Sequence, residues 1–497
     1  MAHSSAAMGR LRRLASRLAR PEPLVLGGIL LLAAWLRFRH LGLQSYWFDE
    51  SVTVQVIHQP FSKMIDSIAA SESTPPAYYL LAWLWTRPLG VSEAGLRSLS
   101  AMAGLAAVPL VWAAGRRLVG VRAGLVAAGV VAASPTLVWY SQEARAYAPM
   151  VLLAAASFLL FLRAREEPRG SWLGAWALAC AVALATHYFT AFLVLPEAGL
   201  LLWRWRRSRL GPVLRAIGAV AAAGLALVPL AVHQEASGRT AWIGASDAGD
   251  RAVQVAKELL TVGAHSVTTG TNPRSLWSVP ALALVLVAAA LVLWLGDAGE
   301  RRGAGLAAAV GAVAIAVPLA LTLTPLDFFQ DRNLLAAWVP LSVALGAGFA
   351  VRRAAATGLL AAGALVAIGV WIDHRVVREP DLHRADWRAL ARALGPASEP
   401  RAILVEPSFA VAPLSVYGHR TTMLAPGTQV REVAVVGQLP AGAGPPVGPG
   451  GLALVQRWQR RELGLLRYRG SRPFTWTAPA LAQVPPLRLE QRTPPRR

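Results

Sequence analysis

The stretch YWFDES, residues Tyr46–Ser51, directly follows the first long apolar run of the chain, which lies near residues 23–40. Its adjacent carboxylates, Asp49 and Glu50, therefore stand at the mouth of a candidate membrane-spanning helix. Ionised side chains are costly inside a bilayer, so such a pair marks either a functional site or an ordinary loop that faces water. The rest of the sequence favours the functional interpretation.

The composition is that of an integral membrane protein. The 497 residues are 55% hydrophobic and 15% charged, with a mean hydropathy of +0.45. Apolar runs recur between short charged connectors, and their length of about 20 residues suits helices that cross about 30 Å of hydrocarbon. The residue alternation expected of barrel strands is absent, so the sequence predicts an all-α polytopic domain.

The net charge of +22 does not indicate nucleic-acid binding, because the basic residues lie mainly in the N-terminal arm, the connectors and the tail. The arm at residues 1–22 is expected to be cytoplasmic and to precede a signal anchor, since no small-residue cleavage site follows the apolar core. The single Cys180 excludes a disulfide framework.

Arginine-rich connectors stay cytoplasmic, which places YWFDES outside the cell membrane and predicts about eleven crossings between residues 23 and 372. An external loop at 41–96 contains the segment Pro75–Leu89, which is apolar but short and has prolines near both ends. If it crossed, Arg116, Arg117 and Arg122 would face outward. If it lies in or against the outer leaflet, every later arginine-rich connector falls on the cytoplasmic side, as the positive-inside rule requires. The predicted C-terminus is then extracytoplasmic.

Residues 373–469 are expected to form a small extracytoplasmic α/β domain. Asp386 can cap a helix that buries Trp387, Leu390, Ala391 and Leu394. The segments RAILVE (401–406) and GLALVQ (451–456) are typical of buried strands. The Pro- and Arg-rich end, residues 470–497, is expected to be disordered, as is a Gly/Pro loop near 440–450.

With this topology, polar residues gather at the outer helix ends. An arginine deep in a membrane costs about 2.5 to 3.5 kcal/mol, so Arg97, Arg145 and Arg332 each need an anionic partner or the interface. One phosphate at the outer leaflet would serve several guanidinium groups. The alternatives are local: Arg97 with Glu93, Arg145 with Glu143, and Arg332 as an interfacial anchor beside Asp331. His187 is either a hydrogen-bonded packing residue or a functional one.

Five segments together resemble the dolichyl-phosphate-mannose protein mannosyltransferase-like branch of the GT-C glycosyltransferases, a branch that includes the bacterial lipid A aminoarabinose transferase. These segments are WFDES (47–51), STPPAYYLLAWLW (73–85), SEAGLRSLSA (92–101), SPTLVWYSQEARAYAPM (134–150) and FFQDRNLLAAWVPLSVAL (328–345). The resemblance covers roughly residues 23–372. The C-terminal domain carries no matching motif.

The resemblance implies a membrane glycosyltransferase with a polyprenyl-phosphate sugar donor and an extracytoplasmic acceptor hydroxyl on a glycan, lipid or protein. The family's catalytic acid carries over to Asp49, with Glu50 beside it, and a later acidic position falls near Glu143, where SQEAR departs from the aspartate of some relatives. Juxtamembrane helices are implied near residues 52–71. Single displacement inverts the anomeric centre.

In this scheme Asp49 is the general base, and Arg97, Arg145 and Arg332 stabilise the leaving phosphate. Substrate contacts are assigned to Tyr46, Trp47, Tyr78, His187 and Tyr188. A divalent cation bridging Asp49 or Glu50 to the phosphate fits the chemistry, but no ligand cluster demands one, so the metal requirement is open. The irregularly spaced Asp373, His374, Asp381, His383 and Asp386 are more typical of a solvated linker.

Two other function classes compete. A transporter or flippase for a lipid-linked anionic substrate would be expected to have internal repeats and polar residues near the bilayer midplane. The ionisable residues here favour the outer ends instead. A non-catalytic scaffold that binds cell-wall polymer would leave the carboxylate pair unexplained.

Overall fold

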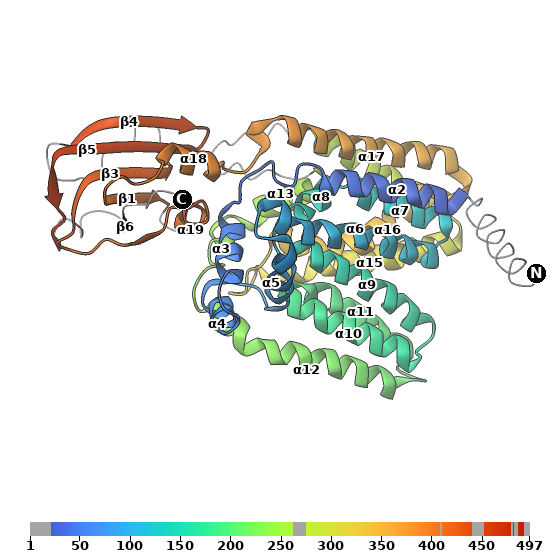
Figure 1. The fold of residues 1–497 in the computed structure, drawn as a ribbon. Coiled ribbons are helices and arrows are strands. Elements are labelled where there is room, and N and C mark those ends of the chain that lie inside the picture. Colours follow the sequence, from blue (N-terminus) through green and yellow to red (C-terminus); the bar gives the residue numbers. More distant parts are fainter. Residues whose placement is uncertain are drawn as a thin grey trace, which may run out of the picture. The chain divides into compact units, whose positions relative to one another are not determined.

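The computed structural model describes residues 21–261, 275–407, 410–439, 452–478, 481 and 486–491. Most of the basic arm and the Gly/Pro loop near 440–450 lie outside these residues. The chain forms two compact units (Figure 1). Of the described residues, the helical unit comprises 21–41, 61–261 and 275–378. The sheet unit comprises 42–60 and the described residues from 379 onward.

The described part of the helical unit is almost entirely helical. Its α-helices are α2 (Pro21–Phe38), α4 (Phe61–Ser71), α5 (Ala77–Leu89), α6 (Glu93–Leu118), α7 (Val121–Ala133), α8 (Pro135–Ser141), α9 (Tyr147–Glu166), α10 (Gly170–Thr186), α11 (Ala191–Trp205), α12 (Leu210–Glu235), α13 (Ala248–Thr261), α14 (Ser275–Ala290), α15 (Ala298–Leu321), α16 (Trp338–Phe349) and α17 (Ala355–Arg378). Short helices intervene: η1 (Tyr188–Thr190), η2 (Ile243–Ala245), η3 (Leu291–Leu295), η4 (Asp331–Ala337) and η5 (Arg352–Ala354).

The predicted polytopic helical fold is confirmed, but the count of eleven crossings is not. Among the described residues, seven helices are long and apolar enough to cross a membrane, or eight if the bent pair α7–α8 is one span. Each of the eleven predicted spans does overlap a helix. The difference arises because α10, α11 and α16 have only 17, 15 and 12 residues.

The segment Pro75–Leu89, whose crossing the sequence left open, forms the 13-residue helix α5. At 1.5 Å per residue this helix is about 20 Å long, short of the roughly 30 Å of hydrocarbon. Its length therefore favours the interpretation in which it does not cross. The helices implied near residues 52–71 are present as α4 and, in the sheet unit, α3 (Phe48–Ile57).

A break between α7 and α8 bends the chain by 58° at Ser134. Pro135 begins α8, and because proline lacks an N–H, it leaves a carbonyl of the preceding turn without its helical partner. The buried guanidinium of Arg37 donates to Val131 O at 2.9 Å and to Ala132 O at 2.8 Å. Arg37 thus satisfies the carbonyls freed at the end of α7.

Small residues let helices approach closely beside this break. A Cβ placed on Gly369 of α17 would lie only 2.1 Å from Ala133 O of α7. At the crossing of α16 and α7, a Cβ on Gly346 would lie 2.5 Å from Ala123 O. Close backbone approach of this kind supplies the van der Waals contact that holds helices together in a membrane.

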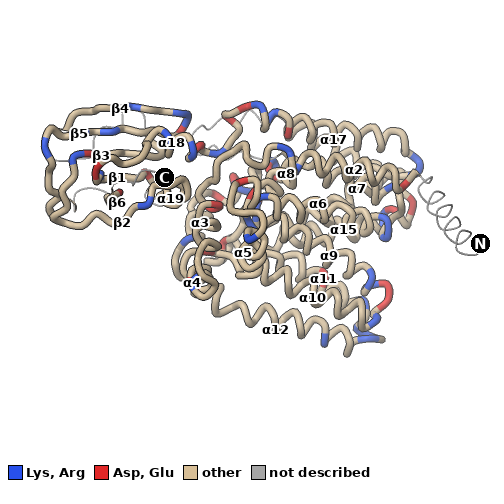
Figure 2. The backbone as a smooth tube through the Cα atoms, viewed as in Figure 1, with Lys and Arg blue, Asp and Glu red and all other residues tan. Residues whose placement is uncertain are grey.

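Charged residues of the helical unit gather at the ends of its helices, whereas the middle is largely uncharged (Figure 2). At one end, ion pairs join connectors that are distant in sequence. Arg116 lies 3.3 Å from Glu22, Arg117 lies 2.5 Å from Glu166, and Arg352 lies 2.8 Å from Asp297. The connectors that the charge rule assigned to one side of the membrane therefore do share one end, as expected of a multi-pass membrane protein.

The sheet unit contains a six-stranded sheet in the order β2-β6-β1-β3-β5-β4. The strands are β1 (Arg401–Glu406), β2 (Thr421–Met423), β3 (Gln429–Gln438), β4 (Leu452–Arg460), β5 (Leu463–Thr475) and β6 (Leu487–Glu490). Among the described strands, only β1 and β3 pair in parallel. Helix α18 (Trp387–Leu394) packs on one face with α19 (Val411–Val416), and η6 (Pro380–Leu382) precedes it.

The predicted helix cap and first strand of this domain are confirmed. Asp386 accepts a hydrogen bond from Ala389 N at 3.1 Å, and the four predicted residues of α18 are buried. Strand β1 is buried as predicted, but β4 is a largely exposed edge strand, so its predicted burial is wrong.

Three predicted boundaries need correction. The end from residue 470 is not disordered throughout, because β5 continues to Thr475 and β6 pairs with both β1 and β2. Helix α17 extends past residue 372 to Arg378. Finally, residues 42–60, predicted as part of the external loop of the helical domain, form a compact unit with the sheet.

Candidate functional site

The predicted site residues are divided between the two units. Four lie in the sheet unit, on or before α3: Tyr46, Trp47, Asp49 and Glu50. Seven lie in the helical unit: Tyr78, Arg97, Glu143, Arg145, His187, Tyr188 and Arg332.

The first turn of α3 gives its two carboxylates different environments. Glu50 is fully buried, accepts a hydrogen bond from Trp47 N at 3.3 Å and lies 4.0 Å from Arg384. Asp49 is only partly buried. Both carboxylates benefit from the positive end of the helix dipole. Glu50 is therefore engaged in anchoring the helix start, whereas part of Asp49 stays accessible.

In the helical unit, Arg145 is the centre of a buried polar group. Its Nη1 donates to both carboxylate oxygens of Glu72, at 3.1 and 2.9 Å, and to the hydroxyl of Tyr79 at 3.2 Å. Thr74 shares a 2.7 Å hydrogen bond with the same hydroxyl. Burial raises the pKa of Tyr79, so this phenol stays neutral near pH 7. Arg145 thus has the anionic partner that its depth requires.

The other two predicted arginines make different contacts. Arg97, also buried, donates to Leu41 O at 2.8 Å, just beyond the end of α2. The guanidinium of Arg332 lies over the indole of Trp242, 5.1 Å from the ring centroid. Stacking of this kind restricts the orientation of the guanidinium plane.

His187 brings two of these arginines to one place. Its ring is buried against Tyr147 and Phe189, at centroid distances of 5.5 and 5.4 Å. The charges of both Arg145 and Arg332 act on it. Phe189 in turn packs against Phe328, with ring centroids 5.1 Å apart. These ring contacts bring the segments that carry Arg145, His187 and Arg332 together at one end of the helical unit.

A second buried cluster, centred on Asp331, adjoins this region. Tyr140 donates to Asp331 at 2.8 Å, and Gln330 donates to the other carboxylate oxygen at 2.7 Å. The charges of Asp331 and Glu143 both act on Tyr140. Burial, together with a hydrogen bond and repulsion from Asp331, raises the pKa of Glu258 on α13. Two carboxyl groups this close favour holding one proton between them.

The aromatic residues that were assigned to substrate contacts also make contacts within the protein. Tyr78 is buried and packs edge-on against Tyr79, with ring centroids 5.5 Å apart. Tyr188 donates to Gln234 at 3.0 Å. In the sheet unit, Tyr46 N donates to the hydroxyl of Tyr417 at 2.7 Å, and Trp47 lies beneath Arg384.

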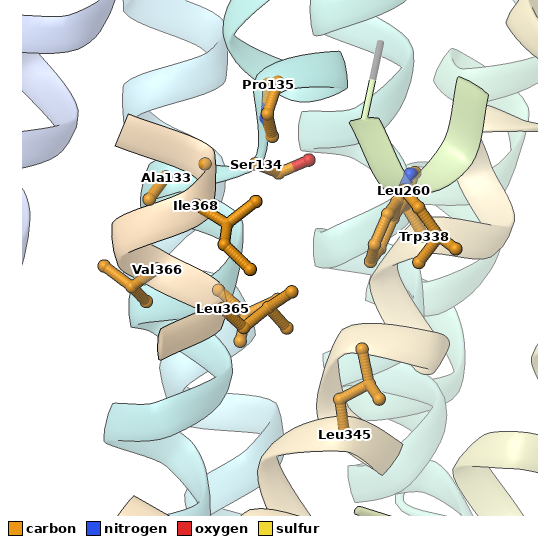
Figure 3. A pocket seen from close by; sticks show the side chains of 11 residues that line it. Ala133, Ser134, Pro135, Leu260, Trp338, Leu345, Leu365, Val366 and Ile368 are labelled. Carbon is orange, nitrogen blue, oxygen red and sulfur yellow. The ribbon is translucent and has the colours of Figure 1, made fainter. Parts of the chain in front are cut away.

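An apolar pocket lies beside the break between α7 and α8 (Figure 3). It is lined by Val130, Ala133, Ser134, Pro135, Leu260, Trp338, Leu345, Leu365, Val366, Ile368 and Gly369. All of these lining side chains are uncharged.

Several residues of these clusters were not predicted from the sequence. Tyr140 and Asp331 stand inside the two motifs that contain Arg145 and Arg332, so their proximity in the chain was a usable signal. Glu258 lies on a loop helix 73 residues before Asp331, and Arg384 lies in a domain without a motif. Across the described ranges, no group of three or more His, Cys, Asp or Glu is arranged to hold a metal ion.

Comparison with known proteins supports the resemblance seen in the motifs. Residues 73–233 match the family model described as dolichyl-phosphate-mannose-protein mannosyltransferase, so the predicted resemblance is confirmed. No curated protein matches the chain.

Three solved structures illustrate the similarity. The oligosaccharyltransferase of Archaeoglobus fulgidus is 13% identical, with 74% of this chain and 55% of that chain covered and a TM-score of 0.43. ArnT from Cupriavidus metallidurans is 12% identical, with 89% and 97% covered and a TM-score of 0.42. The protein O-mannosyltransferase Pmt1-Pmt2 of S. cerevisiae is 21% identical, with 44% and 33% covered and a TM-score of 0.31. This chain thus spans about half the length of the first of them.

Proposed function

Because residues 73–233 match the dolichyl-phosphate-mannose-protein mannosyltransferase family, we propose that this multi-pass membrane protein is a glycosyltransferase that uses a polyprenyl-phosphate sugar. The acceptor is a hydroxyl group of a glycan, lipid or protein on the extracytoplasmic side. The observation that carries the proposal is that the segments bearing Arg145, His187 and Arg332 meet at one end of the helical unit, through the Tyr147–His187 and Phe189–Phe328 ring contacts. An anionic phosphoester is the ligand that such a site favours.

The reaction is a single displacement at the anomeric carbon. The acceptor oxygen attacks that carbon while Asp49 takes the hydroxyl proton, and the bond to the phosphate oxygen breaks. The phosphate oxygen keeps the bonding electron pair, so the lipid phosphate leaves with added negative charge. Attack from the opposite face inverts the anomeric configuration.

Asp49 is favoured over Glu50 as the base because of their surroundings. A general base must reach the proton that it removes, and Asp49 is the less buried of the two carboxylates. Glu50 already accepts a hydrogen bond from Trp47 N and faces Arg384. Glu143, the remaining predicted acid, is buried and acts on Tyr140, which favours an electrostatic role for it.

The arginines are assigned to the phosphate. Arg332 stacks on Trp242, and Arg145 is held by Glu72 through one of its terminal nitrogens. Guanidinium groups that are fixed before the reaction stabilise charge that develops on the leaving phosphate at little reorganisation cost. Arg97, bonded to Leu41 O, is the third candidate for this role.

The chain is proposed to lie in the cell membrane with its arginine-rich connectors cytoplasmic. The ion-paired end that holds Arg116, Arg117 and Arg352 then faces the cytoplasm. The end with Arg145 and Arg332 faces outward, where a lipid-linked donor in the outer leaflet would present its phosphate.

The test is transfer of radiolabelled sugar from a panel of polyprenyl-phosphate sugars by the full chain in proteoliposomes, alongside movement of the same lipids between leaflets. Transfer with inverted anomeric configuration supports the proposal. Lipid movement without transfer from any donor would contradict it and favour the transporter. Arg332→Met should raise the donor KM at least tenfold, and the exposed Arg122→Met should not.

A further inference from the structure

The segment that carries Asp49 is bound to the C-terminal domain by a series of hydrogen bonds within the sheet unit. Ser45 donates to Ala385 O at 3.0 Å, and Arg384 N donates to the side chain of Gln44 at 2.9 Å. Tyr46 N donates to the Tyr417 hydroxyl at 2.7 Å. The residues that lead into α3 are therefore fixed by residues more than 300 positions later in the chain.

Arg384 lies at the centre of these contacts. Its guanidinium is 4.0 Å from Glu50 Oε2 and 5.4 Å from the ring centroid of Trp47, and its side chain is only 11% exposed. A fully buried carboxylate such as Glu50 needs a nearby cation, because an uncompensated buried charge is strongly destabilising. Arg384 supplies that cation at the first turn of α3.

The loop that carries Arg384 is itself held in place. Arg461, at the turn between β4 and β5, donates to Arg384 O at 2.6 Å and to His383 O at 3.1 Å. Arg388 on α18 donates to Gly42 O and Leu43 O, each at 3.1 Å. The sheet, the loop and the start of α3 thus form one continuous hydrogen-bonded structure.

We propose that Arg384 is a positioning residue that fixes the first turn of α3, and with it Asp49, through Glu50 and Trp47. The C-terminal domain then holds the base of the reaction, rather than serving only as a separate binding module. This inference rests on the proposed function for its catalytic part, but the structural coupling between Arg384 and α3 stands independently of the reaction. Misplacing a catalytic group by about 1 Å is enough to lower a rate on the order of a hundredfold.

Amide hydrogen exchange of residues 42–57 in the full chain, reconstituted in lipid nanodiscs, tests the coupling without any substrate. Arg384→Met should accelerate exchange in this segment at least tenfold, and Glu50→Gln should do the same. Arg384→Lys, which keeps the charge, should restore most of the protection. The control is Arg392→Met, which removes an exposed arginine from α18 in the same unit and should leave exchange unchanged.

Sugar transfer tests the catalytic part. Arg384→Met should lower kcat at least tenfold while the donor KM changes less than threefold. The double variant Glu50→Gln/Arg384→Met should be no slower than the slower single variant, because both act through one contact. Exchange in Arg384→Met within twofold of wild type would overturn the inference even if transfer is confirmed. Accelerated exchange in Arg384→Met, combined with a wild-type chain that transfers no sugar from any donor, would contradict the proposed function and leave the coupling intact.

Discussion

Arg145 and Glu72 form a buried ion pair in the helical unit through a bifurcated contact, with one guanidinium nitrogen 3.1 and 2.9 Å from the two carboxylate oxygens. Both side chains are less than a tenth exposed. Removing one partner leaves an uncompensated buried charge, which costs about 3 to 5 kcal/mol. We therefore expect Glu72→Gln to lower the free energy of unfolding by about this amount, measured by denaturant titration in detergent.

The double variant Glu72→Gln/Arg145→Met provides the control for this pair. With both charges removed, the loss in unfolding free energy should be smaller than the sum of the two single losses. Strict additivity would contradict a direct pair.

The contact of Arg37 with the break between α7 and α8 gives a second prediction. Arg37→Met would leave the carbonyls of Val131 and Ala132 buried without this donor. An unsatisfied buried polar group costs about 1 to 3 kcal/mol, so the variant should unfold at lower denaturant concentration. The exposed Arg122→Met should unfold as the wild type does. Equal midpoints for all three proteins would show that Arg37 does not stabilise the break.

The sequence predicted the helices well because long apolar runs and clustered arginines are local signals. The helix cap at Asp386 and the strand Arg401–Glu406 were also predicted correctly, since a capping residue and a run of apolar residues need no distant partner. The bend between α7 and α8 was not predicted, although Pro135 is present in the sequence, because the donor that satisfies the freed carbonyls is the distant Arg37.

Long-range contacts account for the rest of what the sequence did not predict. Strand β6 lies in an Arg- and Pro-rich end, but Leu487 and Leu489 find partners on β1 and β2. The pairing of Glu72 with Arg145 and the neighbourhood of Glu258 and Asp331 join loops that are distant in the chain. Nothing near Glu50 in the sequence indicated Arg384.

Glu258 gives a pH prediction for the helical unit. Its pKa is raised in the folded chain by burial and by Asp331. A carboxyl with a raised folded pKa binds more protons in the folded state, so its contribution to stability falls as the pH rises above the unfolded value of about 4.5. Glu258→Gln, which mimics the protonated acid, should remove this decline. Melting temperatures of wild type and Glu258→Gln, measured from pH 5 to 8, check this prediction. An equal pH dependence in the two proteins would contradict it.

Glu490 in β6 should give the stability of the sheet unit the opposite dependence on pH. Its pKa is lowered: burial alone would raise it, but a hydrogen bond from His419 at 2.9 Å and the charge of Arg401 outweigh burial. The stability from this lowered pKa is present above the unfolded value of about 4.5 and is lost as the pH falls through the folded value. The stability difference between wild type and Glu490→Gln should therefore shrink below about pH 4.5. Hydrogen exchange of residues 401–406 measures it, and a constant difference down to pH 3 would rule this linkage out.

The central claim is that Asp49 is the base of a sugar transfer reaction, and initial transfer rates of two matched variants test it most directly. Asp49→Asn removes the proposed base, whereas Asp66→Asn removes an exposed carboxylate from α4, the next helix along the chain. General-base catalysis contributes about 10² to 10⁴ in rate, so Asp49→Asn should lose at least a hundredfold in kcat while Asp66→Asn matches wild type. Transfer by a folded Asp49→Asn protein within tenfold of wild type would contradict the claim.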